Sequence, residues 1–455
     1  MASSIALVGF VNTEEILADT IKQQTPEVIV DGYELFPNEA FGRLVDNRYV
    51  LYGVDNDGEF GLHNMDRLDA LTKMGYSAIN LGPDTAALVA GEKLDNANID
   101  YIGPRGNELE IEIDKTKIVD IFPDKTKVLP PTKILENSDM KEVQSTIDEF
   151  GGNVVFKFVG EYSDYYPDSE YRRVRLLNEF DSSSELERFV SSSIESSGKV
   201  VIQKFIEGQE FSFTCLVDDN GSIFSLGENI FYKNRHENNK GPLCDGTGSI
   251  SINNTLPNLL STADIDHIKN DIVTPYVDNL GDQFGRSPKT FLNVDLIKGK
   301  DGRVYLLEVN NRQPGGHTMS TLLSGLDTPL ADVLQATQEG RLDEIEARYK
   351  TGASVVVTAF PEISPNDFEK DEDRPVVVVP KLKDSDEVRI YTGWVDLLKE
   401  DKDTATVQSN LTATLLFVSH DASIKKAREN VYKRISQVVS SGLAYRTDIG
   451  QEHTE

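Results

Sequence analysis

Three side chains with oxygen donors lie on two short apolar segments near residue 300. Asp295 is in the run NVDLI, and Glu308 and Asn310 are in the run YLLEVNN. Glu308 and Asn310 are two residues apart, so in a strand they point to the same face. Two carboxylates and an amide oxygen form an all-oxygen ligand set that suits Mg²⁺ bound together with phosphate oxygens. The alternative is that they are edge charges of an ordinary hairpin, although an acid inside an apolar run needs a partner or a metal to offset its desolvation.

A β-hairpin is the element that would bring these three side chains together. The sequence predicts strands over residues 290–297 and 303–309, joined by the turn Lys300-Asp-Gly-Arg. Asp-Gly between two β-rich runs is a strong hairpin signal. Antiparallel pairing can place residues this far apart in the sequence on one surface.

Two upstream segments carry groups suited to a nucleotide. Lys157 is in the apolar run VVFKFV, where its ammonium needs an anion such as phosphate; the alternative is a lysine stem that reaches the surface. The segment VIQKFIEGQE, residues 201–210, ends one strand at a glycine and begins another. Strand edges of this kind offer backbone N–H and C=O groups to an adenine, and Glu210 could bind ribose hydroxyls.

The composition excludes several functional classes. The 455 residues include 46 Lys and Arg against 76 Asp and Glu, a formal net charge of −30, so we expect no binding to nucleic acid or to a membrane surface. The two cysteines, Cys215 and Cys244, exclude a disulfide scaffold and a Cys-based zinc site. No apolar run approaches the roughly 20 residues of a membrane helix, and the N-terminus lacks a signal-peptide pattern. We expect a cytoplasmic monomer or homodimer.

The chain divides into three predicted parts. Residues 1–110 alternate short β-rich runs with segments of helical spacing, which is typical of an α/β domain. Pro130-Pro131 lies in the central part, residues 111–345, ahead of a smaller subdomain at about 150–220. Residues 346–455 are mostly β, with a helix over 422–439. Residues 220–255 are rich in Gly, Asn and Ser and predict a long functional loop.

Taken in order, four of these features resemble the ATP-grasp ligases, in which two α+β subdomains clamp ATP and two Mg²⁺ (or Mn²⁺) ions bridge its phosphates. The four are Lys157, residues 203–210, Asp295 and Glu308-Val-Asn310. The resemblance implies that Lys157 binds phosphates, that Lys204 and Ile206 contact adenine, and that Glu210 holds the ribose. The nucleotide-binding segment that it implies comprises Gln203, Lys204, Phe205, Ile206 and Glu210, and the metal ligands are Asp295, Glu308 and Asn310.

A further family lysine precedes the central domain of these enzymes and also contacts the nucleotide. Lys117 fits its place best by spacing, Lys115 is the competitor, and a solvated helix face is the alternative.

Within the ATP-grasp enzymes, the whole chain most resembles the phosphoribosylamine–glycine ligase family. Two Gly-Pro turns, in Leu81-Gly-Pro-Asp and Tyr101-Ile-Gly-Pro, support this, as do the glycine-rich segment 241–249 and the ending Tyr445-Arg-Thr-Asp-Ile-Gly. The resemblance implies an ATP-grasp fold of α/β and α+β class. Its parts would be an N-terminal Rossmann-like α/β domain, an ATP-grasp domain and a C-terminal mostly β domain.

Three segments depart from the family pattern. The N-terminal glycine-rich turn, which holds the phosphoribosyl phosphate in the family, is replaced by VGFVNT at residues 8–13. The glycine-rich lid after the phosphate lysine is replaced by VGEYSDYY at 159–166. The third departure is Arg312-Gln-Pro-Gly-Gly-His, which resembles the Asn-x-Arg-x-x-Gly-Gly of other ATP-grasp enzymes that activate carboxylic acids.

The chemistry that the resemblance implies is carboxylate activation by ATP through an acyl phosphate, followed by attack of an amine. Arg312 could hold a carboxylate or the transferring phosphoryl group, with a structural salt bridge as the alternative, and the Gly315 and Gly316 amides could stabilise an oxyanion. The leading specific expectation is glycinamide ribonucleotide formation from glycine and phosphoribosylamine. The alternatives are ligation of a different acid or amine, an ATP-grasp phosphotransferase, and a non-catalytic relative.

Basic residues form small islands in this acidic chain. The islands are Arg172, Arg173 and Arg175, and Lys233 with Arg235. They could face an anionic substrate, and solvated loop charges are the alternative.

Overall fold

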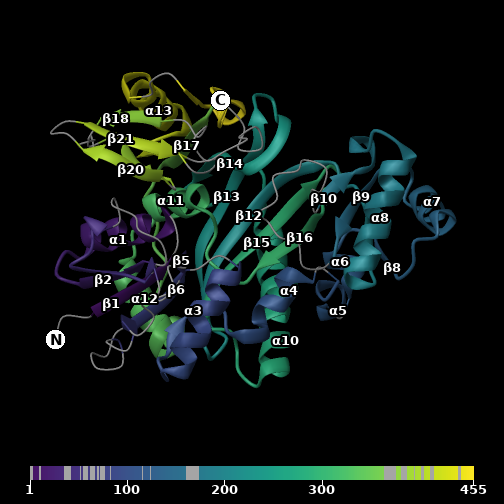
Figure 1. Cartoon of the computed structure of the whole chain (residues 1–455), viewed down its shortest axis with the longest axis horizontal. Helices are drawn as coiled ribbons and strands as arrows, with labels where there is room; N and C mark the ends of the chain where they lie inside the picture. Colours follow the sequence, from purple (N-terminus) through teal and green to yellow (C-terminus); the bar gives the residue numbers. More distant parts are fainter. Residues whose placement is uncertain are drawn as a thin grey trace.

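The computed structural model describes residues 4–9, 12–34, 42–51, 53–54, 60–61, 67–68, 71, 77–81, 84–114, 116–122, 124–159, 174–362, 376–380, 387–393, 395–400, 404–409, 414–438 and 442–454. Within these ranges the chain forms three larger sheets with helices packed on their faces (Figure 1). No helix in them is both long and apolar enough to cross a membrane.

The N-terminal sheet is parallel. Its strands run in the order β3-β2-β1-β6-β7, which are Asn47–Val50, Ile29–Glu34, Ser4–Gly9, Ser77–Leu81 and Tyr101–Ile102. The helices α1 (Asn12–Gln24) and α3 (Asp84–Asn96) connect them. The strand order reverses between β1 and β6, and such a switch point is where open α/β sheets bind ligands. The predicted Rossmann-like α/β domain is confirmed.

The second sheet forms the small subdomain on the right of Figure 1. Its antiparallel strands are β10 (Val174–Leu176), β9 (Val154–Phe158), β11 (Val200–Lys204) and β8 (Thr132–Leu135), and its helices are α7 (Met140–Glu149) and α8 (Ser183–Ser197). Phe156, Phe180 and Phe189 pack edge to face between sheet and helix. Ser182 caps α8, since its Oγ accepts a bond from the Glu185 N–H at 3.2 Å.

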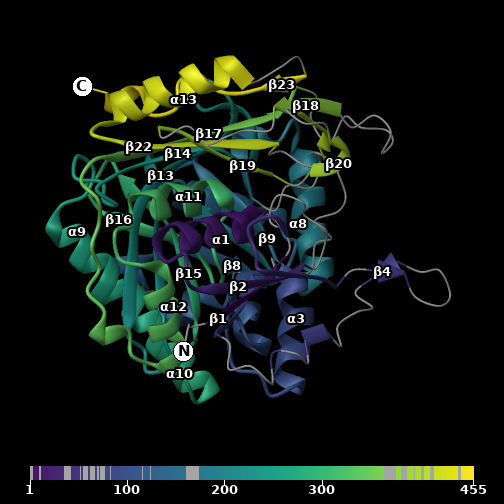
Figure 2. The same ribbon diagram turned by 90° about the vertical axis from the view of Figure 1, so that its left-hand side faces the viewer.

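The large sheet carries most of the candidate site. Its strands run in the order β16-β15-β12-β13-β14-β17-β22-β19, which are Val304–Asn310, Thr290–Gly299, Gly208–Val217, Ile223–His236, Lys240–Ile252, Ala353–Pro361, Leu415–Asp421 and Arg389–Thr392. The short strand β23 (Leu443–Ala444) pairs with β17. One face packs on α10 (Thr274–Phe284) and α13 (Ile424–Val438), and the other on α1 and α11 (Gly316–Gly325). Figure 2 shows α13 and α11 on opposite sides of β17 and β22.

Further strands and helices complete the described part of the chain. They are β4 (Gly53–Val54), β5 (Phe60–Gly61), β18 (Val376–Pro380), β20 (Val395–Glu400), β21 (Thr404–Ser409), α4 (Glu110–Ile113), α5 (Ile118–Ile121), α6 (Lys125–Val128), α9 (Thr262–His267) and α12 (Leu330–Glu339). β14 pairs with β17, so the large sheet runs without a break from the central part of the chain into residues 346–455. The predicted domain boundaries at 110/111 and at 345/346 stay a proposal.

The predicted long loop at residues 220–255 is wrong: β13 and β14 form an extended hairpin there. Gly, Asn and Ser have low strand propensity, which is why composition predicted a loop. Several of the polar side chains are instead buried and bonded; Asn229 Nδ2 donates to Ser249 Oγ at 2.8 Å, and Ser251 Oγ donates to the Glu228 carbonyl at 2.6 Å. Gly246 is needed because a Cβ there would lie 2.4 Å from the His317 ring.

One acid of this hairpin, Glu228, pairs with the core residue Phe213 of β12 and lies on the same face of the sheet. Its side chain is 3% exposed, and burial raises its pKa from 4.5 to about 7. Between these pH values the unfolded chain releases the proton and the folded chain keeps it, so stability falls as the pH rises and the penalty remains above pH 7.

Glu228→Gln is expected to remove this pH-dependent penalty. The variant should gain stability relative to wild type as the pH rises from 4.5 to 7, by up to about 3 kcal/mol. Urea unfolding of both proteins at about pH 5 and about pH 8 measures the gain. A difference between the two proteins that is the same at both pH values would contradict the raised pKa.

Candidate active site

A β-bulge in the β15–β16 hairpin decides which face Glu308 occupies. Leu296 pairs with Leu306, but Asp295 pairs with Glu308, so Leu307 is an extra residue. Without the bulge, Glu308 would lie opposite Val294, whose side chain is in the core. The bulge thus turns Glu308 and Asn310 onto the face of Asp295, and the structure brings the three predicted metal ligands together.

Lys157 reaches the bulge from the small subdomain. Its Nζ donates to the carbonyl of Leu307 at 3.0 Å, next to Glu308 in the chain. The contact joins β9 of one sheet to β16 of another. The lysine predicted to meet phosphates therefore lies beside the predicted metal ligands.

Two polar side chains hold Asp295 in place. Asn293 Nδ2 donates to Asp295 Oδ1 at 3.0 Å, and Thr214 Oγ1 donates to Asn293 Oδ1 at 2.9 Å. Sequence reasoning missed both residues. The two-residue spacing of Asn293 and Asp295, which puts them on one face of β15, is the signal that could have found Asn293.

Lys233 lies between two of the predicted site carboxylates. Its Nζ is 3.4 Å from Asp295 Oδ2 and 3.3 Å from Glu210 Oε2, and it lies over the Phe231 ring at 4.5 Å. Burial alone would lower the pKa of Lys233, but Asp295, Glu210 and Glu308 outweigh it and hold the pKa above its usual range. The site therefore contains a permanent positive charge among its acids.

The predicted adenine segment begins at the end of β11. Gln203 is 5% exposed and its Nε2 donates to Thr132 Oγ1 at 2.9 Å, so this side chain links β11 to β8. The Lys204 N–H donates to the Pro131 carbonyl at 2.8 Å. Pro131 has no N–H to return a bond to the Lys204 carbonyl, which suits that carbonyl to accept from a ligand.

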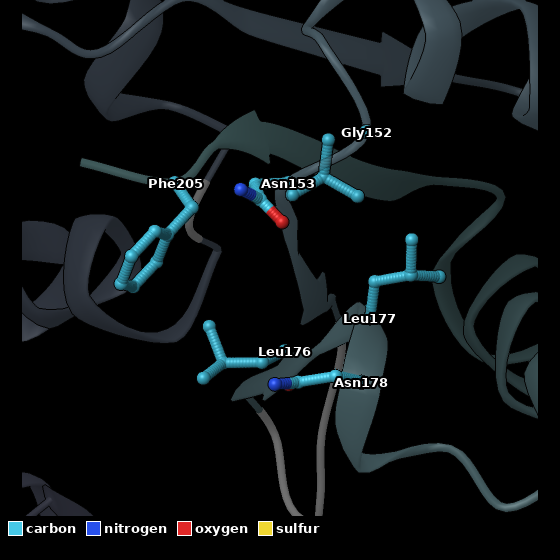
Figure 3. A pocket seen from close by; sticks show the side chains of 7 residues that line it. Gly152, Asn153, Leu176, Leu177, Asn178 and Phe205 are labelled. Atoms are coloured by element: carbon cyan, nitrogen blue, oxygen red, sulfur yellow. The ribbon is translucent and has the colours of Figure 1, made fainter. Parts of the chain in front are cut away.

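Two cavities lie beside this segment. Lys204, Phe205 and Ile206 line one of about 910 Å³ together with Tyr305 of β16. Phe205 also lines a smaller one of about 200 Å³, and Figure 3 shows it there with Leu176. The larger volume is in the range of small-molecule sites, so it has room for an adenine. The contacts of Lys204 and Ile206 with adenine stay a prediction.

The segment after β16 lies against the N-terminal part of the chain. Arg312 Nε donates to Glu112 Oε1 at 2.9 Å, and Gln313 Nε2 donates to the Leu81 carbonyl at the end of β6. The salt bridge considered for Arg312 is thus present, and its role toward a substrate stays a prediction. Gly315 is the N-cap of α11 and Gly316 its first residue, so the predicted oxyanion amides lie at a helix N-terminus.

The other predicted basic residues are placed elsewhere or not described. Lys117 directly precedes α5, while Lys115, Arg172 and Arg173 lie outside the described residues. Arg175 pairs with Glu185 at 2.7 Å in the small subdomain, and Arg235 donates to the Pro361 carbonyl. Within the described ranges, Lys233 is the member of the two basic islands that reaches the site.

The donor set fits a divalent cation held jointly with a ligand. Asp295, Glu308 and Asn310 supply hard oxygen donors, and Asn293 orients one of them. No group of three or more His, Cys, Asp and Glu side chains among the described residues could hold a metal alone. Phosphate oxygens and water would complete the shell, as is usual for Mg²⁺.

The chain's ending holds the tip of the β13–β14 hairpin, which carries Lys233. Arg446 is 2% exposed; it donates to Asp448 Oδ2 at 2.7 Å, to the Asn234 carbonyl at 3.1 Å and to Asn239 Oδ1 at 3.0 Å. Tyr232 donates to Glu452 at 2.6 Å from the same hairpin. The ending thus fixes the strand that places Lys233.

Arg446→Met is expected to lower the free energy of unfolding by about 3–5 kcal/mol, because it leaves the largely buried Asp448 without its cation. Amide hydrogen exchange at residues 234–241 should also become faster. Urea unfolding and hydrogen exchange measure the two effects. Arg348→Met, at an exposed position, is the control and should change neither; equal behaviour of the two variants would contradict the anchoring role.

An acidic side chain, Glu14, lies against the end of β1 in the parallel sheet. The Glu14 side chain is 2% exposed and lies so close to Gly9 that a Cβ there would overlap its carboxyl group. Glu14 belongs to the first turn of α1, where an anion is favourably placed. This is the segment in which the glycine-rich turn of the resembled family is missing.

Comparisons with known proteins show which family the chain resembles. Residues 179–316 match the family model "Phosphoribosylglycinamide synthetase, ATP-grasp (A) domain". The matched stretch includes the adenine segment, Asp295, Glu308, Asn310, and the run from Arg312 to Gly316.

Individual relatives and solved structures match most of the chain. The phosphoribosylamine–glycine ligase of Streptococcus pyogenes is 26% identical over 82% of this chain and 83% of its own. The crystal structure of the Thermotoga maritima phosphoribosylamine–glycine ligase has a TM-score of 0.71 at 18% identity and covers 98% of this chain and 100% of its own. The biotin carboxylase domain dimer of Hydrogenobacter thermophilus 2-oxoglutarate carboxylase, in complex with MgADP and bicarbonate, has a TM-score of 0.66 at 15% identity and covers 100% of this chain and 98% of its own. The predicted fold and the predicted resemblance are confirmed.

Proposed function

We propose that this chain, an ATP-grasp protein that resembles phosphoribosylamine–glycine ligase, joins a carboxylic acid to an amine and releases ADP and phosphate. The observation that carries the proposal is the bulged pairing of β15 and β16. It places Asp295, Glu308 and Asn310 on one face, next to the strand position that Lys157 contacts.

The first step is phosphoryl transfer to the acid. A carboxylate oxygen of the substrate attacks the γ-phosphorus of ATP, the bond to the bridging oxygen breaks, and ADP leaves. Asp295, Glu308 and Asn310 would hold Mg²⁺ or Mn²⁺, which when bound neutralises phosphate charge. Lys157 adds a positive charge beside them. The protein's work in this step is positioning and charge neutralisation.

The second step forms the amide. The amine nitrogen attacks the acyl carbon, the carbon–oxygen bond to phosphate breaks, and the amine proton leaves to solvent. When the amine attacks, the acyl oxygen becomes negatively charged. The Arg312 guanidinium, oriented by Glu112, and the first-turn amides of α11 would stabilise this oxyanion.

The leading substrate pair is glycine with phosphoribosylamine, the pair in the name of the matching relatives. An ADP-release screen of carboxylic acids against amines, including phosphoribosylamine generated in situ, tests it. We expect ADP release that needs both substrates, and an amide of the matching mass. Release without an amine, with a phosphorylated acid accumulating, would support a phosphotransferase; no release with any pair would support a non-catalytic relative.

Ligation of an amine without a phosphate is the second candidate, and Glu14 favours it. The buried Glu14 carboxylate packs against Gly9 and occupies the space that a phosphate would need in this turn. Its negative charge would also repel a phosphate. In the same screen, this candidate predicts faster amide formation with a plain primary amine than with phosphoribosylamine.

The remaining features belong to the same proposal. ATP and Mg²⁺ or Mn²⁺ are the expected ligands, and MgADP is bound in the similar biotin carboxylase domain. That domain is a dimer, and we expect a monomer or homodimer here, located in the cytoplasm.

A further inference from the structure

A separate cavity of about 560 Å³ lies beside Glu228 of β13. Ser212 and Phe213 are neighbours on β12; Ser212 pairs with Asp295, whereas Phe213 pairs with Glu228. Successive side chains of a strand point to opposite faces, so Glu228 faces away from the candidate active site. Glu228 lines this cavity.

The carboxyl group of Glu228 is the unusual feature of the cavity. Its side chain is 3% exposed, yet within the described part of the chain its Oε2 has no hydrogen-bond partner. The surrounding backbone is satisfied: the Glu228 N–H donates to the Asn254 carbonyl at 3.0 Å, and Tyr349 donates to the Ser225 carbonyl at 2.7 Å. A buried carboxylate oxygen without a donor is costly, so Oε2 is suited to receive one from a ligand.

A lysine lines the same cavity without closing onto this acid. Among the described residues, Lys269 acts on Glu228 through its charge and not through a side-chain hydrogen bond; this charge lowers the pKa of Glu228 against the larger effect of burial. It belongs to a π-helical turn, Ile268–Val273, a rare geometry that is frequent at functional sites. The cavity therefore contains a buried hydrogen-bond acceptor, Glu228, and an exposed donor, Lys269.

The lining of the cavity contains apolar residues beside polar ones such as Asn254, Thr255 and Thr274. Phe224, Ile265, Ile345 and Ala347 line the cavity. Its volume is in the range of sites for small molecules. The occupant therefore needs a cationic donor, an anionic acceptor and an apolar body.

We propose that this cavity binds a small α-amino acid with an apolar side chain, its ammonium group on Glu228 and its carboxylate toward Lys269. None of the residues that line the cavity belongs to the candidate active site, and the proposal does not depend on the proposed function.

Equilibrium dialysis with radiolabelled L-leucine tests the proposal. Wild type should bind leucine saturably at one site per chain. Glu228→Gln and Lys269→Gln should each weaken binding by at least about tenfold, the loss expected for one charge-assisted hydrogen bond. Isopentylamine and 4-methylpentanoate, which each lack one charged group of leucine, should compete more weakly than unlabelled leucine.

Two variants outside the cavity are the controls. Lys426→Gln, on the exposed side of α13, and Arg312→Ala, in the candidate active site, should bind leucine as wild type does. The proposal is wrong if wild type shows no saturable binding, if neither cavity variant weakens it, or if Arg312→Ala alone abolishes it. The last result would place leucine on the nucleotide side instead. Glu228→Gln preserves the shape of the side chain, and Lys269 is exposed, so both variants should fold, which circular dichroism verifies.

Discussion

Glu308→Gln is expected to lower the kcat of ATP-dependent ligation on the order of 10³-fold while leaving the fold intact. Glutamine has the same size but removes a negative charge from a ligand set of two carboxylates and one amide. The bulge at Leu307 fixes the side chain opposite Asp295, so no other acid of β16 can replace it. ADP release with the best substrate pair measures the effect.

Glu339→Gln is the matched control for this variant. Glu339 ends α12, is exposed and pairs with Arg341, so its loss should leave kcat within about twofold of wild type. Circular dichroism and urea unfolding should show both variants folded. Unchanged turnover in Glu308→Gln would remove the assignment of a metal to this face.

Lys157→Met is expected to reduce kcat/KM for ATP by on the order of 10²–10³-fold. The methionine keeps most of the stem and removes the ammonium that now donates to the Leu307 carbonyl. Because this cation lies beside Glu308, its loss should weaken both binding and transfer of the phosphates. Steady-state kinetics over a range of ATP concentrations measure the change.

Lys141→Met is the control for the same subdomain. Lys141 is exposed on α7, and its side chain should contribute nothing to kcat/KM. If Lys157→Met and Lys141→Met behave alike, Lys157 is a structural lysine that links two sheets, and the phosphate role is wrong.

The sequence was sufficient for the hairpin but not for its register. Asp-Gly between two β-rich runs predicts the β15–β16 turn, and Asp295, Glu308 and Asn310 were identified from their apolar surroundings. Leu306 and Leu307 are the same residue type, so the pattern does not show which of them is extra. The bulge is determined by packing, since Leu306 and Val309 both belong to the core although they are three residues apart.

Composition predicted the wrong structure for β13 and β14. Gly, Asn and Ser are typical of loops, and their buried hydrogen bonds depend on partners far away in the sequence, such as Thr318 for Asn229 at 3.1 Å. The same hairpin carries Lys233 and Glu228 on opposite faces of the sheet. Lys233 was one of several basic residues without a known partner, and Glu228 gave no signal at all. Both became interpretable only through the strands beside them.

The direct test of the central claim is whether Asp295, Glu308 and Asn310 hold a divalent ion with a nucleotide. Mn²⁺ binding in the presence of a non-hydrolysable ATP analogue can be followed by electron paramagnetic resonance in wild type, Glu308→Gln and Glu339→Gln. We predict nucleotide-dependent Mn²⁺ binding in wild type and in Glu339→Gln, and a loss of at least about tenfold in affinity in Glu308→Gln. Equal Mn²⁺ affinity in all three proteins would contradict the claim.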